Sequence, residues 1–345
     1  MNKILVTGGC GYIGSHTIVD LIQHGYEVIS IDNNSRSSNL ILEGVKKITG
    51  KFVKNYCIDL CNLIETENIF KENDDIIGVV HFAAFKSVNE SVENPQLYFH
   101  NNINSLLNVL KCCEKFSISN FVFSSSCTVY GNAEIIPVTE DTPLKEAESP
   151  YGYTKQIGEK IIQHFINSNG LQTILLRYFN PVGAHFSNEI GEMPIGEPAN
   201  LVPIITQTAI GKLSNMKVFG NDYPTKDGSC IRDFIHVSDI ARAHTLSLNL
   251  LIQKKNKTNC EVFNLGSGNG YSVLELINCF EKISKVKLNY SITNRRNGDV
   301  IAIFADNNKA KNILGWVPST SLEDMLYTAW NWELKMKNEK LLFNN

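Results

Sequence analysis

The sequence of 345 residues has no excess of positive charge, because 35 aspartates and glutamates outnumber 32 lysines and arginines and leave a formal net charge of −3. Proteins that bind the phosphate backbone of nucleic acids usually carry a basic stripe. We therefore expect no nucleic-acid partner. A ligand of nucleotide size remains compatible with this composition, since it needs only a few local cations.

The sequence also lacks long apolar runs and a regular cysteine pattern. No uninterrupted apolar stretch approaches the roughly 20 residues that span a bilayer, and Gly8 and Gly9 interrupt the apolar start before a signal peptide could form. The nine cysteines are an odd number without the paired Cys-x-x-Cys spacing of zinc sites. These features predict a cytoplasmic protein with reduced thiols, no membrane contact and no metal site.

The first half of the chain alternates short β-branched runs with longer stretches of helical period. Such alternation is typical of parallel strands joined by crossover helices. It predicts an α/β protein with a doubly wound, parallel Rossmann-type sheet, whose ligand crevice lies outside the carboxyl ends of the strands. The expected strands are 4–7, 27–32, 55–58, 79–82, 120–124 and 173–177, and the expected helices are 13–24, 96–116 and 151–168.

The second half differs in composition. Glycine and proline are spread through 181–200, before an expected helix over 201–211. Because the chain exceeds one typical domain of roughly 100 to 200 residues, we expect a first domain over 1–180 and a smaller C-terminal α/β lobe over 181–345. The chain is expected to return to the first domain around 233–265, where 233–249 and 262–265 look sheet-like. The polar tail from Lys335 is expected to fray.

The segment from Ile4 to Gly14 predicts a strand, a glycine turn and the start of a helix. Gly8 permits a sharp turn, Gly11 lets backbone N–H groups approach a pyrophosphate, and Gly14 lets the helix pack closely on the strand. A glycine pattern alone also fits a purely structural turn. An acidic residue about 20 positions further on favours a dinucleotide site.

That acidic residue is Asp32, at the end of the expected strand 27–32. A carboxylate there can accept both ribose hydroxyls of adenosine and would repel a 2′-phosphate, so NAD is favoured over NADP. The alternative is an ordinary turn at the end of a strand. Asp59 ends another strand, and for this residue a contact with adenine and a surface turn remain equally open.

Tyr151 and Lys155 stand four positions apart in a helix that Pro150 introduces, so they share one helix face. A phenol titrates near 10, and its pKa must fall by roughly 3 units, or about 4 kcal/mol, before it acts as a base at neutral pH. The Lys155 ammonium and a positive nicotinamide ring could supply this in a low-dielectric cleft. Ser126 follows the strand 120–124 and can hydrogen-bond the reacting oxygen. A chance Tyr-x-x-x-Lys spacing and a serine-rich turn are the alternatives.

These elements together resemble the extended short-chain dehydrogenase/reductase superfamily, and within it the UDP-glucose 4-epimerases, over nearly the whole chain. The motifs that carry the resemblance are TGGCGYIGS from Thr7, HFAA from His81, RYFNPVGAH from Arg177 and GNDYPTKDGSCIRDFIHV from Gly220. The resemblance implies an NAD-binding first domain and a UDP-sugar-binding second lobe. It implies that the catalytic residues are Ser126, Tyr151 and Lys155. The implied cofactor contacts are Gly8, Gly11, Tyr12, Ile13, Gly14, Asp32, Asn33, Asp59, Leu60, Phe82, Ala83, Lys86, Asn101, Ser124, Tyr151, Lys155 and Tyr178. The implied substrate contacts are Lys86, Ser126, Tyr151, Tyr178, Asn180, Asn200, Leu201, Val218, Phe219, Arg232, Arg296, Asp299 and Ile303.

The residue types suit the implied substrate. Arg232 and Arg296 are forked cations that match a pyrophosphate, although each arginine alone could equally be a surface charge. Phe219 offers a flat apolar face, and Asn180 offers an amide. Family members with tyrosine at the position of Ile303 tend to refuse N-acetylated sugars, whereas small residues there admit them. Because isoleucine is intermediate in size, we expect weak acceptance of UDP-N-acetylgalactosamine.

The resemblance implies an isomerase of galactose metabolism that interconverts UDP-glucose and UDP-galactose through transient oxidation at sugar C4, rotation of the 4-keto intermediate and return of the hydride. It also implies tightly bound NAD and a homodimer packed through the helices 96–116 and 151–168. A nucleotide-sugar 4,6-dehydratase is the nearest alternative, but it needs an Asp-Glu pair where this sequence has Cys127 and Thr128. A silent NAD-binding regulator is a further alternative, and such proteins usually lack the tyrosine or the lysine.

Overall fold

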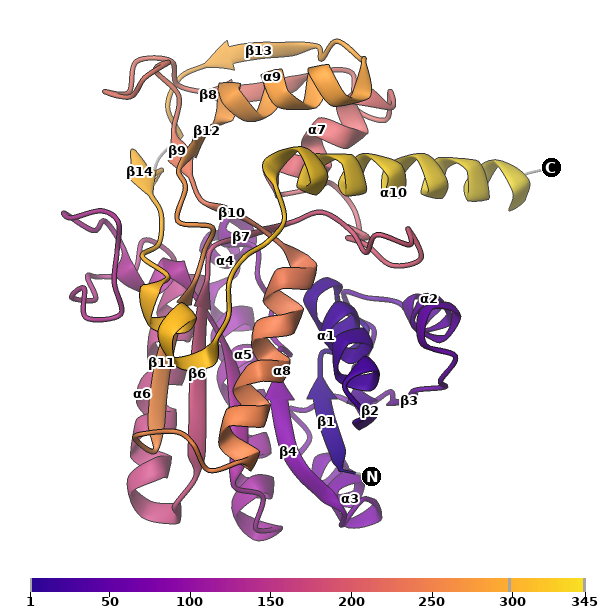
Figure 1. Ribbon diagram of the computed structural model, residues 1–345, viewed down its shortest axis with the longest axis vertical. Helices are drawn as coiled ribbons and strands as arrows, with labels where there is room; N and C mark the ends of the chain where they lie inside the picture. Colours follow the sequence, from indigo (N-terminus) through magenta and orange to yellow (C-terminus); the bar gives the residue numbers. More distant parts are fainter. Residues whose placement is uncertain (1, 297–298, 344–345) are drawn as a thin grey trace.

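A seven-stranded sheet lies at the centre of the protein, which Figure 1 shows as a computed structural model that describes residues 2–296 and 299–343. All neighbouring strands in this sheet are parallel. Their order is β3-β2-β1-β4-β5-β6-β11, so the chain starts in the middle and builds outwards in both directions. This order confirms the doubly wound Rossmann-type sheet. The strands are β1 (Lys3–Thr7), β2 (Glu27–Ile31), β3 (Lys54–Tyr56), β4 (Ile76–His81), β5 (Asn120–Ser126), β6 (Gln172–Tyr178) and β11 (Cys260–Leu265).

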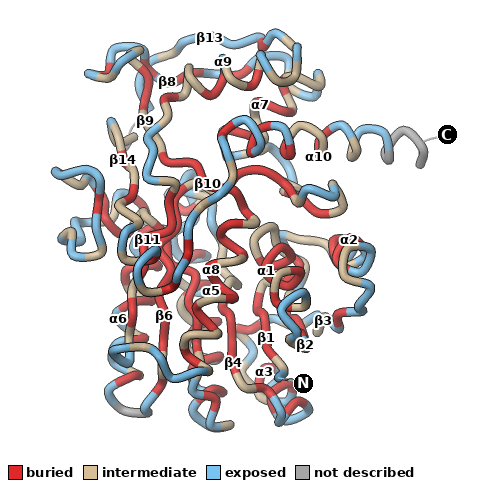
Figure 2. The backbone as a smooth tube through the Cα atoms, in the orientation of Figure 1, coloured by how far each residue is buried: buried red, intermediate tan, exposed pale blue. Residues whose placement is uncertain are grey.

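Helices cover both faces of this sheet. Successive side chains of a strand point to opposite faces, so strands that are apolar throughout need a layer of helices on each side. In β1, Ile4 and Val6 belong to one apolar cluster and Leu5 belongs to the other. The buried residues in Figure 2 follow the sheet and the inner sides of the helices. One face carries α1 (Tyr12–Gln23), α2 (Leu40–Thr49) and α8 (Val237–Ile252). The other face carries α3 (Leu63–Glu72), α5 (Pro95–Lys115) and α6 (Pro150–Asn169). Two short helices complete this part of the chain, α4 (Val88–Glu93) before α5 and η1 (Cys127–Tyr130) after β5.

Smaller sheets and helices lie beyond the carboxyl ends of the main strands, at the top of Figure 1. They comprise a three-stranded sheet, β12-β9-β14, and two strand pairs, β10-β7 and β13-β8. Val202, Phe280 and Leu326 belong to the apolar cluster that joins them. The elements are β7 (Asn180–Val182), α7 (Leu201–Ala209), β8 (Met216–Phe219), β9 (Ile231–Arg232), β10 (Phe234–His236), β12 (Tyr271–Ser272), α9 (Val273–Ser284), β13 (Tyr290–Thr293), β14 (Ala302–Ile303) and α10 (Leu322–Phe343). The short η2 (Ala310–Leu314) instead packs beside the main sheet, against β11 and α8.

The sheet-like prediction for 233–249 is wrong for most of its length. Only the short β10 lies there, and α8 follows it from Val237. The His236 ring caps this helix by accepting a hydrogen bond from the backbone N–H of Ser238 at 3.1 Å. The buried residues of α8 recur at helical spacing, and they include Ile240, His244, Leu248 and Leu251.

The prediction of a frayed tail from Lys335 is also wrong, because α10 continues to Phe343. Trp332 and Met336 pack against the main apolar cluster, and the Lys335 ammonium lies 2.7 Å from the carboxylate of Glu189. These contacts stabilise the helix although its end is polar. Within residues 2–296 and 299–343, no helix is both long and apolar enough to cross a membrane.

Candidate active site

The turn between β1 and α1 has no room for side chains at two of its glycines. Gly8 has a φ of +69°, and a Cβ there would lie 2.9 Å from the backbone nitrogen of Ala83. A Cβ on Gly14 would lie 2.2 Å from the carbonyl oxygen of Gly8. Gly11 is the N-cap of α1 and has no side chain to cover the first N–H groups of the helix. The turn therefore presents a bare helix N-terminus to an anion such as a pyrophosphate.

The carboxylate of Asp32 lies beside this turn, directly after β2. It accepts hydrogen bonds from the backbone N–H groups of Cys10 at 3.0 Å and Asn34 at 2.9 Å, and from the Ser37 hydroxyl at 2.7 Å. These bonds hold an acceptor-only group where the adenosine ribose of NAD would need one. A 2′-phosphate would meet a like charge here. The glycine turn and Asp32 together therefore fit NAD.

Two further cofactor candidates lie at the start of α1. The Tyr12 hydroxyl donates a hydrogen bond to the carbonyl oxygen of Gly183 at 2.5 Å, and burial raises the pKa of this phenol. Ile13 packs against the main apolar cluster. Tyr12 therefore links the cofactor turn to the segment that follows β7.

The other cofactor candidates follow β2, β3 and β4 or lie on α5. Asn33 and Asp59 are exposed, and Asp59 accepts a hydrogen bond from the backbone N–H of Cys61 at 2.8 Å. Leu60 differs, because its side chain belongs to the core and only its backbone can face a ligand. Half-buried positions are occupied by Phe82, Ala83 and Asn101.

The helix α6 brings Tyr151 and Lys155 to the end of β5. Pro150 stands in its first turn, and the hydroxyl of the N-cap Ser149 accepts a backbone hydrogen bond at 3.2 Å. The buried Lys155 ammonium donates to the carbonyl oxygen of Ser124 at 2.7 Å and lies 5.9 Å from the ring centroid of Tyr151. The ammonium thus lies beside the phenol ring while it is anchored to β5.

Burial controls the protonation of both groups. It raises the pKa of Tyr151 to about 12, although a hydrogen bond with Ser126 acts in the opposite direction. It also lowers the pKa of Lys155 to about 8, against the attraction of Glu159. Without a cofactor the phenol is therefore neutral at pH 7. A further cation beside it, such as a nicotinamide ring, would lower this pKa and favour the phenolate.

Tyr178 joins this group from the neighbouring strand. It stands opposite Ser126 in the β5–β6 ladder, and its hydroxyl hydrogen-bonds the hydroxyl of Ser124. Burial raises the pKa of Tyr178, and the nearby Tyr151 adds to this effect. The two serines, the two tyrosines and Lys155 therefore lie together at the carboxyl ends of β5 and β6, where a doubly wound sheet places its ligand.

A buried ion pair that the sequence analysis missed lies next to these residues. The carboxylate of Glu159 accepts hydrogen bonds from Arg177 at 2.9 Å to Nε and 2.6 Å to Nη2. It also accepts the Ser125 hydroxyl at 2.5 Å. The spacing of Glu159 from Lys155 on α6 and the place of Arg177 directly before Tyr178 are the sequence signals that could have indicated it.

Glu192 is a second residue that the sequence analysis missed. One of its oxygens accepts a hydrogen bond from the Lys86 ammonium at 2.8 Å and another from the side-chain amide of Asn200 at 2.8 Å. Lys86 follows β4, whereas Asn200 is the N-cap of α7. One carboxylate therefore joins a predicted cofactor contact to a predicted substrate contact. Its position within a long irregular segment gave no pattern from which to predict this link.

Arg232 and Arg296 share the carboxylate of Asp299. The same oxygen lies 3.3 Å from Nη2 of Arg232 and 2.7 Å from Nη2 of Arg296. The Arg296 guanidinium also lies 5.4 Å from the ring centroid of Phe219. Two cations and a partly exposed aromatic ring thus form one surface, which suits a diphosphate next to a flat base.

Three predicted substrate contacts have side chains that are largely covered by other residues. The Val218 side chain is 1% exposed, so only its backbone can meet a ligand. Leu201 packs against the cluster around α7. Ile303 is buried in a small cluster with Tyr130 and Phe179.

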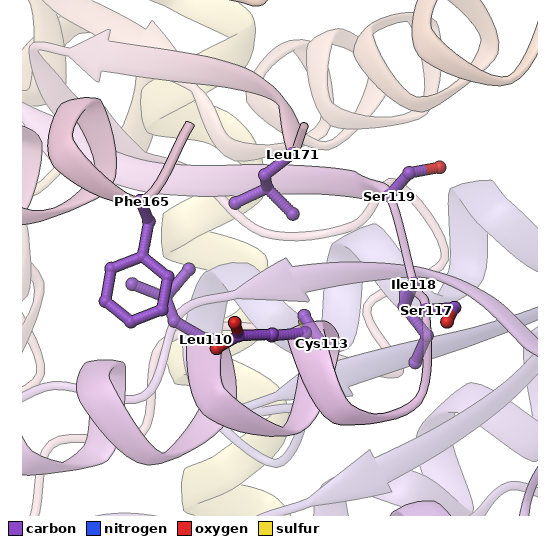
Figure 3. Close-up of a pocket in the computed structure, with 8 residues that line it drawn as sticks. Leu110, Cys113, Ser117, Ile118, Ser119, Phe165 and Leu171 are labelled. Atoms are coloured by element: carbon purple, nitrogen blue, oxygen red, sulfur yellow. The ribbon is translucent and has the colours of Figure 1, made fainter. Parts of the chain in front are cut away.

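A cavity of about 260 Å³ lies away from all these residues, where α5 and α6 end near the amino end of β5 (Figure 3). Leu110, Cys113, Phe165 and Leu171 are among its lining residues. It contains no predicted site residue, and we assign it no role. The described part of the chain contains no group of three or more His, Cys, Asp or Glu side chains that could hold a metal ion.

Residues 4–266 match the model of a family described as NAD dependent epimerase/dehydratase. A UDP-glucose 4-epimerase of Bacillus subtilis is 48% identical over 331 residues, which cover 96% of each chain. The crystal structure of a UDP-glucose 4-epimerase from Bifidobacterium longum in complex with NAD+ and UDP has a TM-score of 0.93 and 43% identity, and covers 98% of this chain and 99% of that one. A UDP-glucose 4-epimerase from Stenotrophomonas maltophila with bound NAD and formylated UDP-arabinopyranose has a TM-score of 0.94 and 41% identity, over 98% and 100% of the two chains. With its glycine turn, its Asp32 and these similarities over nearly its full length, the chain belongs to the NAD dependent epimerase/dehydratase family.

Proposed function

We propose that the protein is an isomerase that interconverts UDP-glucose and UDP-galactose, with tightly bound NAD as its cofactor. The observation that carries this proposal is the grouping of Ser126, Tyr151 and Lys155 at the carboxyl end of β5. The similar proteins of B. subtilis and B. longum are named for this activity, and the latter binds NAD+ and UDP in its crystal.

Bound NAD would take the C4 hydrogen of the sugar as a hydride and later return it to the opposite face. Tyr151, as a phenolate, takes the proton of the 4-hydroxyl and gives it back at the end of the cycle. Ser126 donates a hydrogen bond to the same oxygen and directs it towards the phenol. The Lys155 ammonium favours the ionised form of Tyr151. Proton transfer in both directions therefore runs through a single phenol.

Return of the hydrogen to the other face requires that the sugar turns while the nucleotide stays in place. Arg232 and Arg296 would hold the diphosphate, and Phe219 would cover the uracil. Asn180 and Asn200 would add amide hydrogen bonds. A firm hold on UDP with few fixed contacts to the hexose permits this rotation.

A direct test is to mix the purified protein with UDP-galactose and measure UDP-glucose, without added reductant. The proposal expects conversion to an equilibrium mixture and release of NAD when the protein is denatured. Absence of UDP-glucose, or product that forms only in proportion to added NADH, would contradict it.

A 4,6-dehydratase activity has less support, because removal of water needs two further acid or base groups. Burial raises the pKa of the Cys127 thiol to about 12, so it stays protonated. The neighbouring Thr128 is an alcohol, and its backbone N–H donates to the Ser126 hydroxyl at 3.3 Å. A neutral thiol and an alcohol are poor substitutes for two carboxylic groups.

We further propose weak activity on UDP-N-acetylgalactosamine. Ile303 is paired with Arg232 in the β14–β9 ladder, and it would therefore border the sugar pocket next to a diphosphate-binding arginine. Isoleucine leaves more space there than tyrosine and less than a small residue. The N-acetyl group would therefore be admitted with difficulty.

The proposed assembly is a homodimer that pairs through α5 and α6. Apolar side chains are exposed on this side of the protein. They include Val92 of α4, Leu97 of α5 and Tyr153 of α6, which are 61%, 41% and 48% exposed. Burial of these side chains against a second copy would remove apolar area from water.

The remaining proposals concern the division of the chain and its compartment. Residues 1–180, together with a return around 233–265, would bind NAD, and 181–345 would mainly bind the UDP-sugar. The pairing of β11 with β6 supports the return. A cytoplasmic location is supported by the nine cysteines, all of which are free.

A further inference from the structure

Asp233 is a fully buried acid that the proposed reaction does not use. It stands between β9 and β10 and is 0% exposed. Its Oδ1 accepts hydrogen bonds from the backbone N–H and the hydroxyl of Ser267, at 2.7 and 2.6 Å. Its Oδ2 accepts the backbone N–H groups of Ala305 at 3.1 Å and Gly268 at 3.3 Å. Four donors thus converge on one carboxylate, which as an ion is acceptor-only.

These donors lie next to the two strands that flank Arg232. In the three-stranded sheet, Arg232 of β9 stands opposite Tyr271 of β12 on one side and Ile303 of β14 on the other. Ser267 and Gly268 lie in the loop that leads into β12, and Ala305 follows β14. The carboxylate therefore ties both neighbours of β9 to the residue that follows Arg232.

The backbone of Asp233 holds a second candidate substrate contact. Its carbonyl oxygen accepts the backbone N–H of Asn180 at 3.0 Å and the side-chain amide of Asn180 at 2.8 Å. The amide orientation of Asn180 is thus set by the same residue whose carboxylate braces β9.

The loop that contains Ser267 and Gly268 packs tightly against the carboxylate of Asp233. A Cβ added to Gly266 would lie 2.2 Å from Oδ2 of Asp233 and 2.7 Å from the Ala305 side chain. A side chain that changes size or hydrogen-bonding pattern at position 233 must therefore move the loop, β14 or both.

We propose that Asp233 is a positioning residue for the nucleotide-sugar site, which fixes Arg232 through the strands on both sides of it and orients Asn180 through its carbonyl oxygen. This inference rests on the proposed function, because it takes Arg232 and Asn180 as contacts of UDP. The residue itself touches neither substrate nor cofactor.

The test is the full-length, NAD-loaded variant Asp233→Asn, with the dissociation constant for UDP measured by calorimetry and the NAD content by absorbance. An asparagine of the same shape turns one acceptor oxygen into an amide donor that faces backbone N–H groups. We expect UDP binding to weaken on the order of tenfold, with NAD content unchanged. UDP binding within twofold of the wild type would overturn the inference while the proposed function stands. Failure of the wild type itself to bind UDP would overturn both.

Asp239→Asn is a matched control. Asp239 is also buried, and its carboxylate also accepts neutral donors, from Ser319 and Thr320 at 3.1 to 3.3 Å. Its carbonyl oxygen accepts the Trp316 indole at 2.8 Å. These partners lie outside the proposed UDP contacts, so we expect this variant to lose stability but to keep UDP binding within twofold of the wild type. Equal weakening of UDP binding in both variants would overturn a specific role for Asp233.

If Asp233→Asn does not fold, two further variants test whether Asp233 acts on UDP binding through Arg232. Ser267→Ala removes one of the four hydrogen bonds, and we expect UDP to bind about threefold more weakly; unchanged binding would overturn the inference. In a double-mutant cycle, the effect of Ser267→Ala should shrink when Arg232→Ala is also present, because the first residue acts through the second. If Ser267→Ala weakened UDP binding equally in the presence of Arg232→Ala, the inference that Asp233 acts through Arg232 would be overturned.

Discussion

Arg177 and Glu159 form a two-point ion pair inside the protein, and their side chains are only 6% and 3% exposed. Arg177 comes from β6, and Glu159 lies one helical turn beyond Lys155 on α6. The pair therefore joins the helix that carries the proposed base to the strand next to β5. A buried charge without its partner is costly, so the pair couples the geometry of the site to the stability of the fold.

Glu159→Gln should lower the free energy of unfolding by roughly 3 to 5 kcal/mol, because it leaves the Arg177 guanidinium buried without a counter-charge. Urea denaturation measures this change. The control is Glu67→Gln, which breaks a surface pair with Lys115 at 2.7 Å and should lower the free energy of unfolding far less, because solvent screens the pair. A loss no larger than in the control would show that the buried pair contributes little.

Tyr151→Phe should lower kcat roughly 100-fold or more, because it removes the only proton acceptor in the proposed reaction. The affinity for UDP should remain unchanged, since the phenol meets the sugar and not the nucleotide. Initial rates with UDP-galactose and calorimetry with UDP separate the two effects. Tyr153→Phe changes an exposed tyrosine two positions further on and should leave kcat unchanged. Equal turnover by the Tyr151 variant would exclude its role as the base.

Stability should depend on pH through Lys155. The pKa of its ammonium is about 8 in the folded chain against 10.5 for an ordinary lysine. Between these pH values the unfolded chain holds a proton that the folded chain lacks, so the contribution of Lys155 to the free energy of unfolding rises with pH, by at most about 1.4 kcal/mol per unit.

Lys155→Met provides the comparison for this prediction, since methionine does not titrate. Relative to the variant, the wild type should gain stability as the pH rises above about 8. Below that value the difference should be constant, because lysine is protonated in both states. Urea denaturation of both proteins between pH 7 and 10 measures the difference. A flat difference across this range would mean that Lys155 titrates normally.

The size of residue 303 should control the use of N-acetylated substrates. The wild type is expected to turn over UDP-N-acetylgalactosamine slowly, Ile303→Ala faster relative to UDP-galactose, and Ile303→Tyr not at all. Because Ile303 is buried among apolar side chains, the alanine variant should also lose about 2 to 5 kcal/mol of stability. Ile303→Val, which costs only about 0.5 to 1.5 kcal/mol, separates the two effects. Absence of any N-acetyl turnover by the wild type would refute the hypothesis.

The elements that the sequence predicted correctly are those whose signal is local. The turn around Gly8 and the helix start at Pro150 depend on backbone requirements within a few residues. The central strands are β-branched runs buried on both faces, which have the same composition wherever they lie in the sheet. The helix α8 was missed because its apolar and β-branched residues fit either period over a short window.

The acids that brace the site, of which Glu159 and Asp233 are buried and Glu192 is half-buried, could not be predicted in the same way. Glu159, Glu192 and Asp233 bind partners that lie between 8 and 106 positions away in the chain. Such contacts depend on which strands and loops become neighbours. A local pattern, such as the spacing of Glu159 from Lys155, indicates a shared helix face but not the partner on another element. Val218 shows the converse, because a position that the resemblance assigns to substrate binding can still point its side chain into the core.

The three consecutive serines at the end of β5 have different partners, because alternate residues of a strand point to opposite faces. Ser124 and Ser126 are directed to the two tyrosines, whereas Ser125 is directed to Glu159. After deletion of one residue before these serines, they could keep their places only if the preceding part of β5 slipped by one position against β6, which would exchange the two faces of that part. If that part stayed in place, the serines would shift by one position, and Cys127 would stand where Ser126 stands. Changes in strand length should therefore be tolerated here far less than changes of side chain.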